Sequence, residues 1–119
     1  MAERLTNEQR RFLNSSMPVI ERHYQFYLAQ ESEYAHKPHP DLSQGELEAK
    51  LHAIRNMKYL TQLAIHMNNQ VSSLDDLGDT AQKAGRHQDA MDCWTSSDNE
   101  ERELHHVVET IMSALRPQG

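Results

Sequence analysis

Eight histidines stand among the 119 residues, and two of them follow a glutamate by three positions. The pairs Glu33/His36 and Glu103/His106 each place a carboxylate and an imidazole on one helical face, a spacing used in di-iron helical bundles. Such a bundle also needs an inward glutamate from each of two other helices. Because His106 points away from the apolar side of its own helix, and no HExxH motif occurs, we expect no metal ligands. A metal-binding helical bundle is the third interpretation of this sequence.

Residues that could act as nucleophiles or hold a cofactor are sparse. Cys93 is the single cysteine, and its place beside Trp94 is typical of a small core residue. There is no GxSxG motif, and the scattered glycines form no phosphate-binding loop; they stand at Gly45, Gly78, Gly85 and Gly119. The sequence therefore predicts no catalytic residue, no cofactor and no enzymatic activity.

Charge is distributed unevenly along the chain. Residues 1–71 carry eight acidic and eight basic side chains, whereas residues 72–103 carry the whole net charge of −6. The acids there are Asp75, Asp76, Asp79, Asp89, Asp92, Asp98, Glu100, Glu101 and Glu103, against Lys83, Arg86 and Arg102. An acidic surface repels phosphates, so we expect no direct nucleic-acid binding. It suits a basic protein surface, or it is simply a solvated face.

The expected cellular compartment is inferred from two sequence patterns that we do not find. Its first residues have no apolar core of the kind found in signal peptides. No apolar run approaches the roughly 20 residues that span a membrane. We therefore expect a cytoplasmic protein with no membrane partner.

Helix-forming residues dominate the composition, and capping signals divide the chain. Thr6 with Gln9, Ser43 with Glu46, and Asp98 with Glu101 each have the spacing of a helix start. Pro18 indicates a restart or kink, and the proline-containing segment 36–45 a loop. A long helix is expected over 43–71, an acidic helical hairpin over 74–97, and a last helix from Asp98 to near residue 116. The prediction is one all-α domain, residues 1–119, built as a small bundle of four to five helices.

The hairpin segment carries a family resemblance. Residues 74–94 resemble one tetratricopeptide repeat in the order and spacing of Leu77-Gly78, Gly85, Ala90 and Trp94. We therefore expect two short helices joined at Gly85. The resemblance implies close packing at the small residues, with Trp94 in the seam, and a role in holding other proteins. An ordinary αα-hairpin is the alternative.

One face of the expected long helix is polar and regularly spaced. His52, Arg55, Tyr59, Gln62 and His66 recur at intervals of three and four residues. Together with Asp75, Asp76 and Asp79 of the hairpin, they are our candidate partner-binding residues. A solvated helix face is the alternative.

Apolar side chains on the same helix fall on two nearly opposite sides, and the last helix carries a narrow stripe of its own. That stripe consists of Leu104, Val107, Val108, Ile111 and Leu115. A short chain has few helices to cover so much apolar surface, which favours a homodimer through the long or the last helix. A monomer whose spare stripe holds the partner is the alternative.

These features together predict a small non-enzymatic protein-binding adaptor, chaperone or assembly and regulatory factor that acts through helical faces. The alternative is an inhibitor from a phage or mobile element that blocks a larger host complex through its acidic surface. In either case the partner is a protein.

Overall fold

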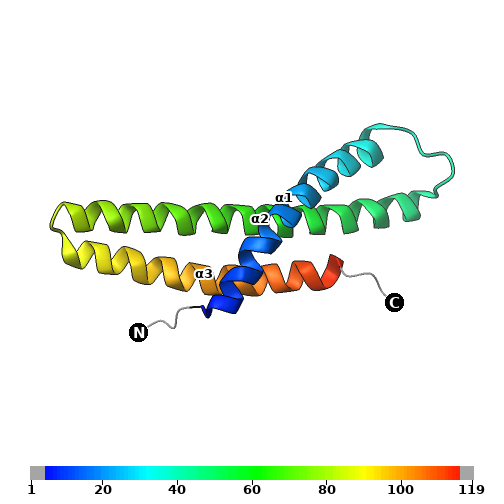
Figure 1. The fold of residues 1–119 in the computed structure, drawn as a ribbon. Coiled ribbons are helices and arrows are strands. Elements are labelled where there is room, and N and C mark those ends of the chain that lie inside the picture. The colour runs from blue at the N-terminus through cyan, green and yellow to red at the C-terminus, as the bar shows by residue number, and fades with distance from the viewer. Residues whose placement is uncertain (1–4, 116–119) are drawn as a thin grey trace.

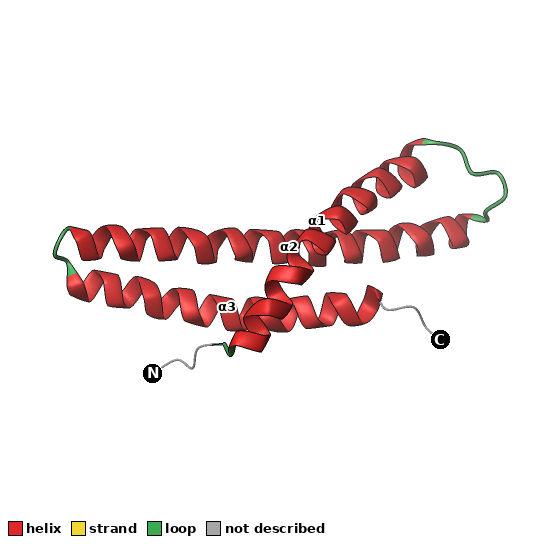
Figure 2. Cartoon of the chain, viewed as in Figure 1, coloured by secondary structure: helices red, strands yellow, loops and turns green. Residues whose placement is uncertain are grey.

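A computed structural model of the protein describes residues 5–115, and these form three α-helices with no strand. The helices are α1 (Asn7–His36), α2 (Gln44–Lys83) and α3 (His87–Leu115), joined by two short connections (Figure 2). The all-α prediction is confirmed, but the expected count of four to five helices is wrong. At about 1.5 Å per residue the 40 residues of α2 span roughly 60 Å, in line with the molecule's longest dimension of 64 Å.

Two of the three expected helix starts lie where the sequence places them. Thr6 and Gln9 form a capping box at the start of α1, and Ser43 and Glu46 form one at the start of α2. Each hydroxyl accepts a backbone N–H that the first turn leaves free, and each N3 side chain accepts the N-cap N–H in return. The third start is wrong, because Asp98 lies inside α3, which begins eleven residues earlier.

The expected interruption at Pro18 does not occur either, since α1 runs through it without a break. Proline has no N–H to bond the carbonyl of Asn14, which costs a helix one hydrogen bond. Both Asn14 and Pro18 lie on the exposed side of α1, where water can bond that carbonyl. The loop after α1 covers residues 37–43, slightly less than the predicted 36–45.

The turn between α2 and α3 is a Schellman motif centred on Gly85. Gly85 has a φ of +79°, a left-handed conformation that glycine adopts without strain. Its N–H donates to the Gln82 carbonyl, and the Arg86 N–H donates to the Ala81 carbonyl at 2.9 Å. The predicted turn is confirmed, but the two short helices expected at 74–97 are the adjoining ends of α2 and α3.

All three helices meet at one crossing, which we call the junction (Figure 1). Each helix supplies three buried apolar side chains to a common core: Leu13, Met17 and Ile20 of α1, Ala64, Met67 and Val71 of α2, and Leu104, Val108 and Ile111 of α3. The central members of the last helix's apolar stripe are thus part of the core of the chain itself. They are not available as a dimer seam.

Beyond the junction, α2 and α3 continue together as a two-helix projection that α1 does not cover (Figure 1). We call residues 72–103 the arm; they carry the nine acidic and three basic side chains counted above. Within residues 5–115, no helix is both long enough and apolar enough to cross a bilayer.

Candidate functional site

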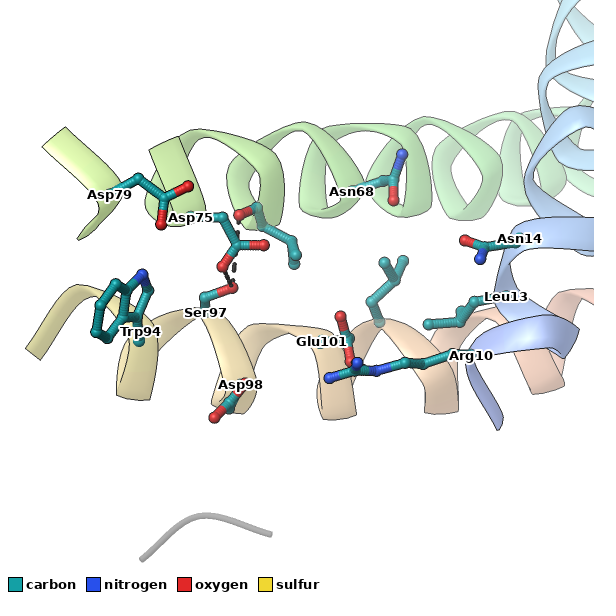
Figure 3. A pocket seen from close by; sticks show the side chains of 12 residues that line it. Arg10, Leu13, Asn14, Asn68, Asp75, Asp79, Trp94, Ser97, Asp98 and Glu101 are labelled. Atoms are coloured by element: carbon teal, nitrogen blue, oxygen red, sulfur yellow. Dashed lines mark hydrogen bonds and ion pairs between the residues drawn. The ribbon is translucent and has the colours of Figure 1, made fainter. Parts of the chain in front are cut away.

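A groove of about 560 Å³ lies where the arm meets the junction (Figure 3). All three helices contribute to it: α1 supplies residues of its first two turns, and α2 and α3 each supply residues that recur about once per turn. Its lining is Arg10, Leu13, Asn14, Asn68, Val71, Asp75, Asp79, Trp94, Ser97, Asp98, Glu101 and Leu104. The aliphatic members, Leu13, Val71 and Leu104, are buried core side chains, so polar side chains and the Trp94 indole form the accessible wall.

The groove is strongly acidic. Asp75 and Asp79 reach it from α2, and Asp98 and Glu101 reach it from α3. Among residues 5–115, Arg10 is the single basic residue in the lining, and its Nε lies 3.3 Å from Glu101 Oε1. Even with Asp98 left out of the count, three lining carboxylates against this one guanidinium leave a negative potential, which the protein walls concentrate inside the hollow.

Trp94 is held in place by the absence of a side chain on the opposite helix. A Cβ built on Gly78 would collide with the indole Nε1 and Cδ1 atoms, so the ring lies directly against the α2 backbone. Ala81 and Ala90, both buried, keep the helices close on the next turn. Trp94 itself is half-buried, with part of the ring facing the groove. It therefore belongs both to the seam and to the groove wall.

A buried hydroxyl orients one of the carboxylates. Ser97 is 2% exposed, and its Oγ donates to Asp75 Oδ1 at 2.6 Å, linking α3 to α2 across the groove (Figure 3). This distance lies at the short end of the range for hydroxyl hydrogen bonds. This bond orients the Asp75 carboxylate, although Asp75, like Asp79 one turn farther along α2, is exposed overall.

The predicted acidic residues divide between two surfaces. Asp75 and Asp79 line the groove, whereas Asp76 lies on the exposed side of α2 outside it. The polar line His52, Arg55, Tyr59, Gln62 and His66 is exposed along its whole length, with Tyr59 at 63%. It lies nearer the N-terminus of α2 than the groove does, so the structure does not bring the two halves of the predicted site together.

Arg55 of that line is engaged within the chain. Its Nε lies 3.0 Å from Glu31 Oε2 of α1, and Lys58 Nζ lies 2.8 Å from Glu31 Oε1. Hydrogen bonds from Lys58 and then Arg55 lower the pKa of the Glu31 carboxyl below its usual value. This cluster ties the second half of α1 to α2.

The histidine–glutamate pairs do not act together. Glu33 forms an ion pair with Lys37 at 2.9 Å, which lowers the pKa of the Glu33 carboxyl, and His36 is exposed. The His106 side chain is 83% exposed, as its position on the helix predicts. Between residues 5 and 115, no group of three or more His, Cys, Asp or Glu side chains is placed to hold a metal ion.

His105, the residue next to His106, was not singled out in the sequence analysis, but its side chain is buried, with 8% of its surface exposed. The imidazole packs edge-on against Phe12, and its Nδ1 lies 2.7 Å from Glu109 Oε1.

The sequence analysis did not identify Ser97, Arg10 and Glu101 as groove residues. Arg10 comes from a different helix, and Ser97 and Glu101 were not recognised as members of one continuous helix face. The spacing of Ala90, Trp94, Ser97, Glu101 and Leu104 by four and three residues marks one helical face, but Asp98 was taken as a helix start.

The chain matches no protein-family model, no curated protein and no solved structure.

Proposed function

We propose that this protein is a non-enzymatic protein-binding factor, an adaptor, chaperone or assembly factor, that holds a basic amphipathic segment of a partner protein along its acidic arm. The observation that carries the proposal is the groove, which is lined by a half-buried tryptophan and by the carboxylates of Asp75, Asp79 and Glu101.

Charge supports a basic partner. The arm holds the entire net charge of the chain, and the Arg10 guanidinium, the single cation among the described residues that line the groove, is already paired with Glu101. Lysine and arginine side chains of a partner would be attracted over long range and would then face carboxylates at close range.

Apolar groups on the arm support an amphipathic segment. Leu77 is 58% exposed and Met91 56% exposed, and the Trp94 ring adds an aromatic surface within the groove. Tryptophan is among the residues that contribute most to protein interfaces. Two helices without a third offer a long seam against which an amphipathic helix can lie, as in helix-in-groove recognition. The close packing at Gly78 and Trp94 is in keeping with the resemblance to a tetratricopeptide hairpin, which we retain as part of this proposal.

A fluorescence titration tests the proposal directly, because Trp94 is the only tryptophan in the chain. We expect a lysine- and arginine-rich amphipathic peptide to change the emission of Trp94 and to bind less tightly as salt is raised. Asp79→Lys should weaken this binding several-fold.

The matched control is Glu48→Lys, which makes the same charge reversal at an exposed position of α2 outside the arm. It should leave the affinity nearly unchanged. Equal weakening by both variants would show that binding depends on net charge and not on the groove.

A further inference from the structure

One end of the groove is already occupied by an arginine of the chain itself. Near the junction, Arg10 Nε of α1 lies 3.3 Å from Glu101 Oε1 of α3, and the Glu101 side chain is 19% exposed. This pair shows that the groove can hold a guanidinium against a partly buried carboxylate. It also neutralises Glu101, so a cation that arrives from outside is drawn to the other end of the groove, away from the junction.

The other end, which we call the arm end, is lined by Asp75, Asp79, Trp94 and Ser97. Helices α2 and α3 run antiparallel here, and two contacts fix their register: Ser97 Oγ donates to Asp75 Oδ1, and the Trp94 ring lies against Gly78. Trp94 comes three residues before Ser97 on α3, and Asp79 comes four residues after Asp75 on α2. Each step is about one helical turn. The indole therefore lies level with the turn of α2 that carries Asp79 (Figure 3).

Both carboxylates of the arm end can accept further hydrogen bonds. The Ser97 hydroxyl bonds one oxygen of Asp75; the second oxygen, and both oxygens of Asp79, accept no hydrogen bond from any residue among 5–115. Side chains four residues apart on a helix are separated by about 5–6 Å at Cβ. A guanidinium carries five N–H donors in one plane and can bond two acceptors at this spacing, whereas an ammonium is a compact point charge.

The Trp94 ring favours the same group. Trp94 is half-buried, and part of its ring faces the groove. A guanidinium stacks flat on an aromatic face while the N–H groups at its edge stay free to bond carboxylates. An ammonium is more strongly hydrated, so it loses more on entering a half-buried hollow. Ring and carboxylates together therefore suit arginine better than lysine.

We propose that the arm end of the groove is an arginine-selective subsite, in which a guanidinium of the partner stacks on Trp94 and donates to Asp75 and Asp79. This inference rests on the proposed function, and it names the side chain that the partner segment places in the groove. A lysine at the same position of the segment is attracted by the charge of the arm but makes fewer bonds within the subsite.

Two amphipathic peptides of one sequence test the inference, with arginine at every basic position in the first and lysine in the second. Each carries a dye, and the anisotropy of the dye measures binding to the full chain independently of Trp94 emission. We expect the arginine peptide to bind about tenfold more tightly, as for a partly desolvated cation–π contact. Asp79→Asn should remove most of this preference. Asp76→Asn is the matched control, because it removes the same charge from the exposed side of α2 outside the groove and should leave the preference unchanged.

A second variant isolates the ring. Trp94→Leu keeps an apolar side chain in the seam but removes the aromatic face, so it should lower the affinity for the arginine peptide to that for the lysine peptide. Circular dichroism confirms that each variant is folded, and Asp79→Asn alters an exposed side chain outside the seam. Equal affinity of the wild type for both peptides, or an undiminished preference in Asp79→Asn, would overturn the subsite and leave the proposed function standing. Failure of both peptides to bind would overturn the two together.

Discussion

The junction and the arm are both built on α2 and α3, yet the two regions hold these helices together by different means. At the junction a third helix is present, and three apolar side chains from each helix fill the space between them. In the arm two helices must seal their own seam, and they do so with Gly78, Ala81 and Ala90, which let the backbones approach closely. A pair of helices offers little volume to bury, so small residues and one flat aromatic ring replace the usual aliphatic core.

This difference assigns separate roles to the two regions. Burial of large aliphatic groups is the main source of folding free energy, and the junction contains nearly all of it. The arm contributes length, negative charge and exposed apolar groups. The surface that we propose as partner-binding thus lies where it adds least to the stability of the chain.

The largest effect should come from removing a junction side chain. Ile20 is fully buried and joins α1 to the α2–α3 pair, so Ile20→Ala should lower the free energy of unfolding by about 2–5 kcal/mol. Met91→Ala, at an exposed position of the arm, should change it little. Chemical denaturation measures both, and similar losses in the two variants would contradict the division of roles.

A smaller effect is expected where the arm is sealed. Gly78→Ala places a methyl group against the Trp94 indole, and overpacking of this kind costs about 1–3 kcal/mol. Gly45→Ala is the matched control, because nothing lies within 4 Å of its added Cβ. It should be neutral or slightly stabilising, since alanine favours helix over glycine by about 1 kcal/mol.

A double-mutant cycle makes this prediction specific. In a Trp94→Ala background the collision is gone, so Gly78→Ala should no longer destabilise the protein. A penalty that persists without the indole would show that Gly78 is required for another reason.

The smallest effect should come from the ion-pair cluster of Glu31. Its pKa is lowered in the folded state, so its bonds to Lys58 and Arg55 stabilise the fold above the usual carboxyl pKa and are lost as pH falls through the folded value. Glu31→Gln should therefore lower Tm at neutral pH, and the difference from wild type should shrink steadily below pH 4.5. A Tm difference that is independent of pH would rule out the carboxylate as its source.

Two helix starts and the glycine turn could be predicted from sequence because they depend on residues no more than five positions apart. Thr6 with Gln9, Ser43 with Glu46, and Gly85 each determine their geometry locally. The extent of α2 and α3 could not be predicted in the same way. Ser72, Ser73 and Gly78 are poor helix formers, and they remain helical where α3 packs alongside. Gly78 in particular serves the Trp94 contact, which joins residues 16 positions apart.

The groove illustrates the same limit. Acidic residues of the arm were recognised from their number, but Arg10 enters the groove from another helix, 91 positions away from Glu101 in sequence. The sequence analysis also placed His52 and His66 in one candidate site with Asp75, on the basis of composition and helical spacing, but the structure separates them. Only the crossing of α1 over α2 and α3 shows which part of α2 remains beside the groove.

Hydrogen exchange of the full chain, with and without a lysine- and arginine-rich amphipathic peptide, tests the central claim most directly. Without peptide, amides of residues 72–103 should exchange faster than those of the junction, because a two-helix seam opens more readily than a three-helix core. With peptide, protection should rise over residues 72–103 and stay unchanged over residues 44–66. Protection gained over residues 44–66 instead, or an arm as slow to exchange as the junction, would contradict the account.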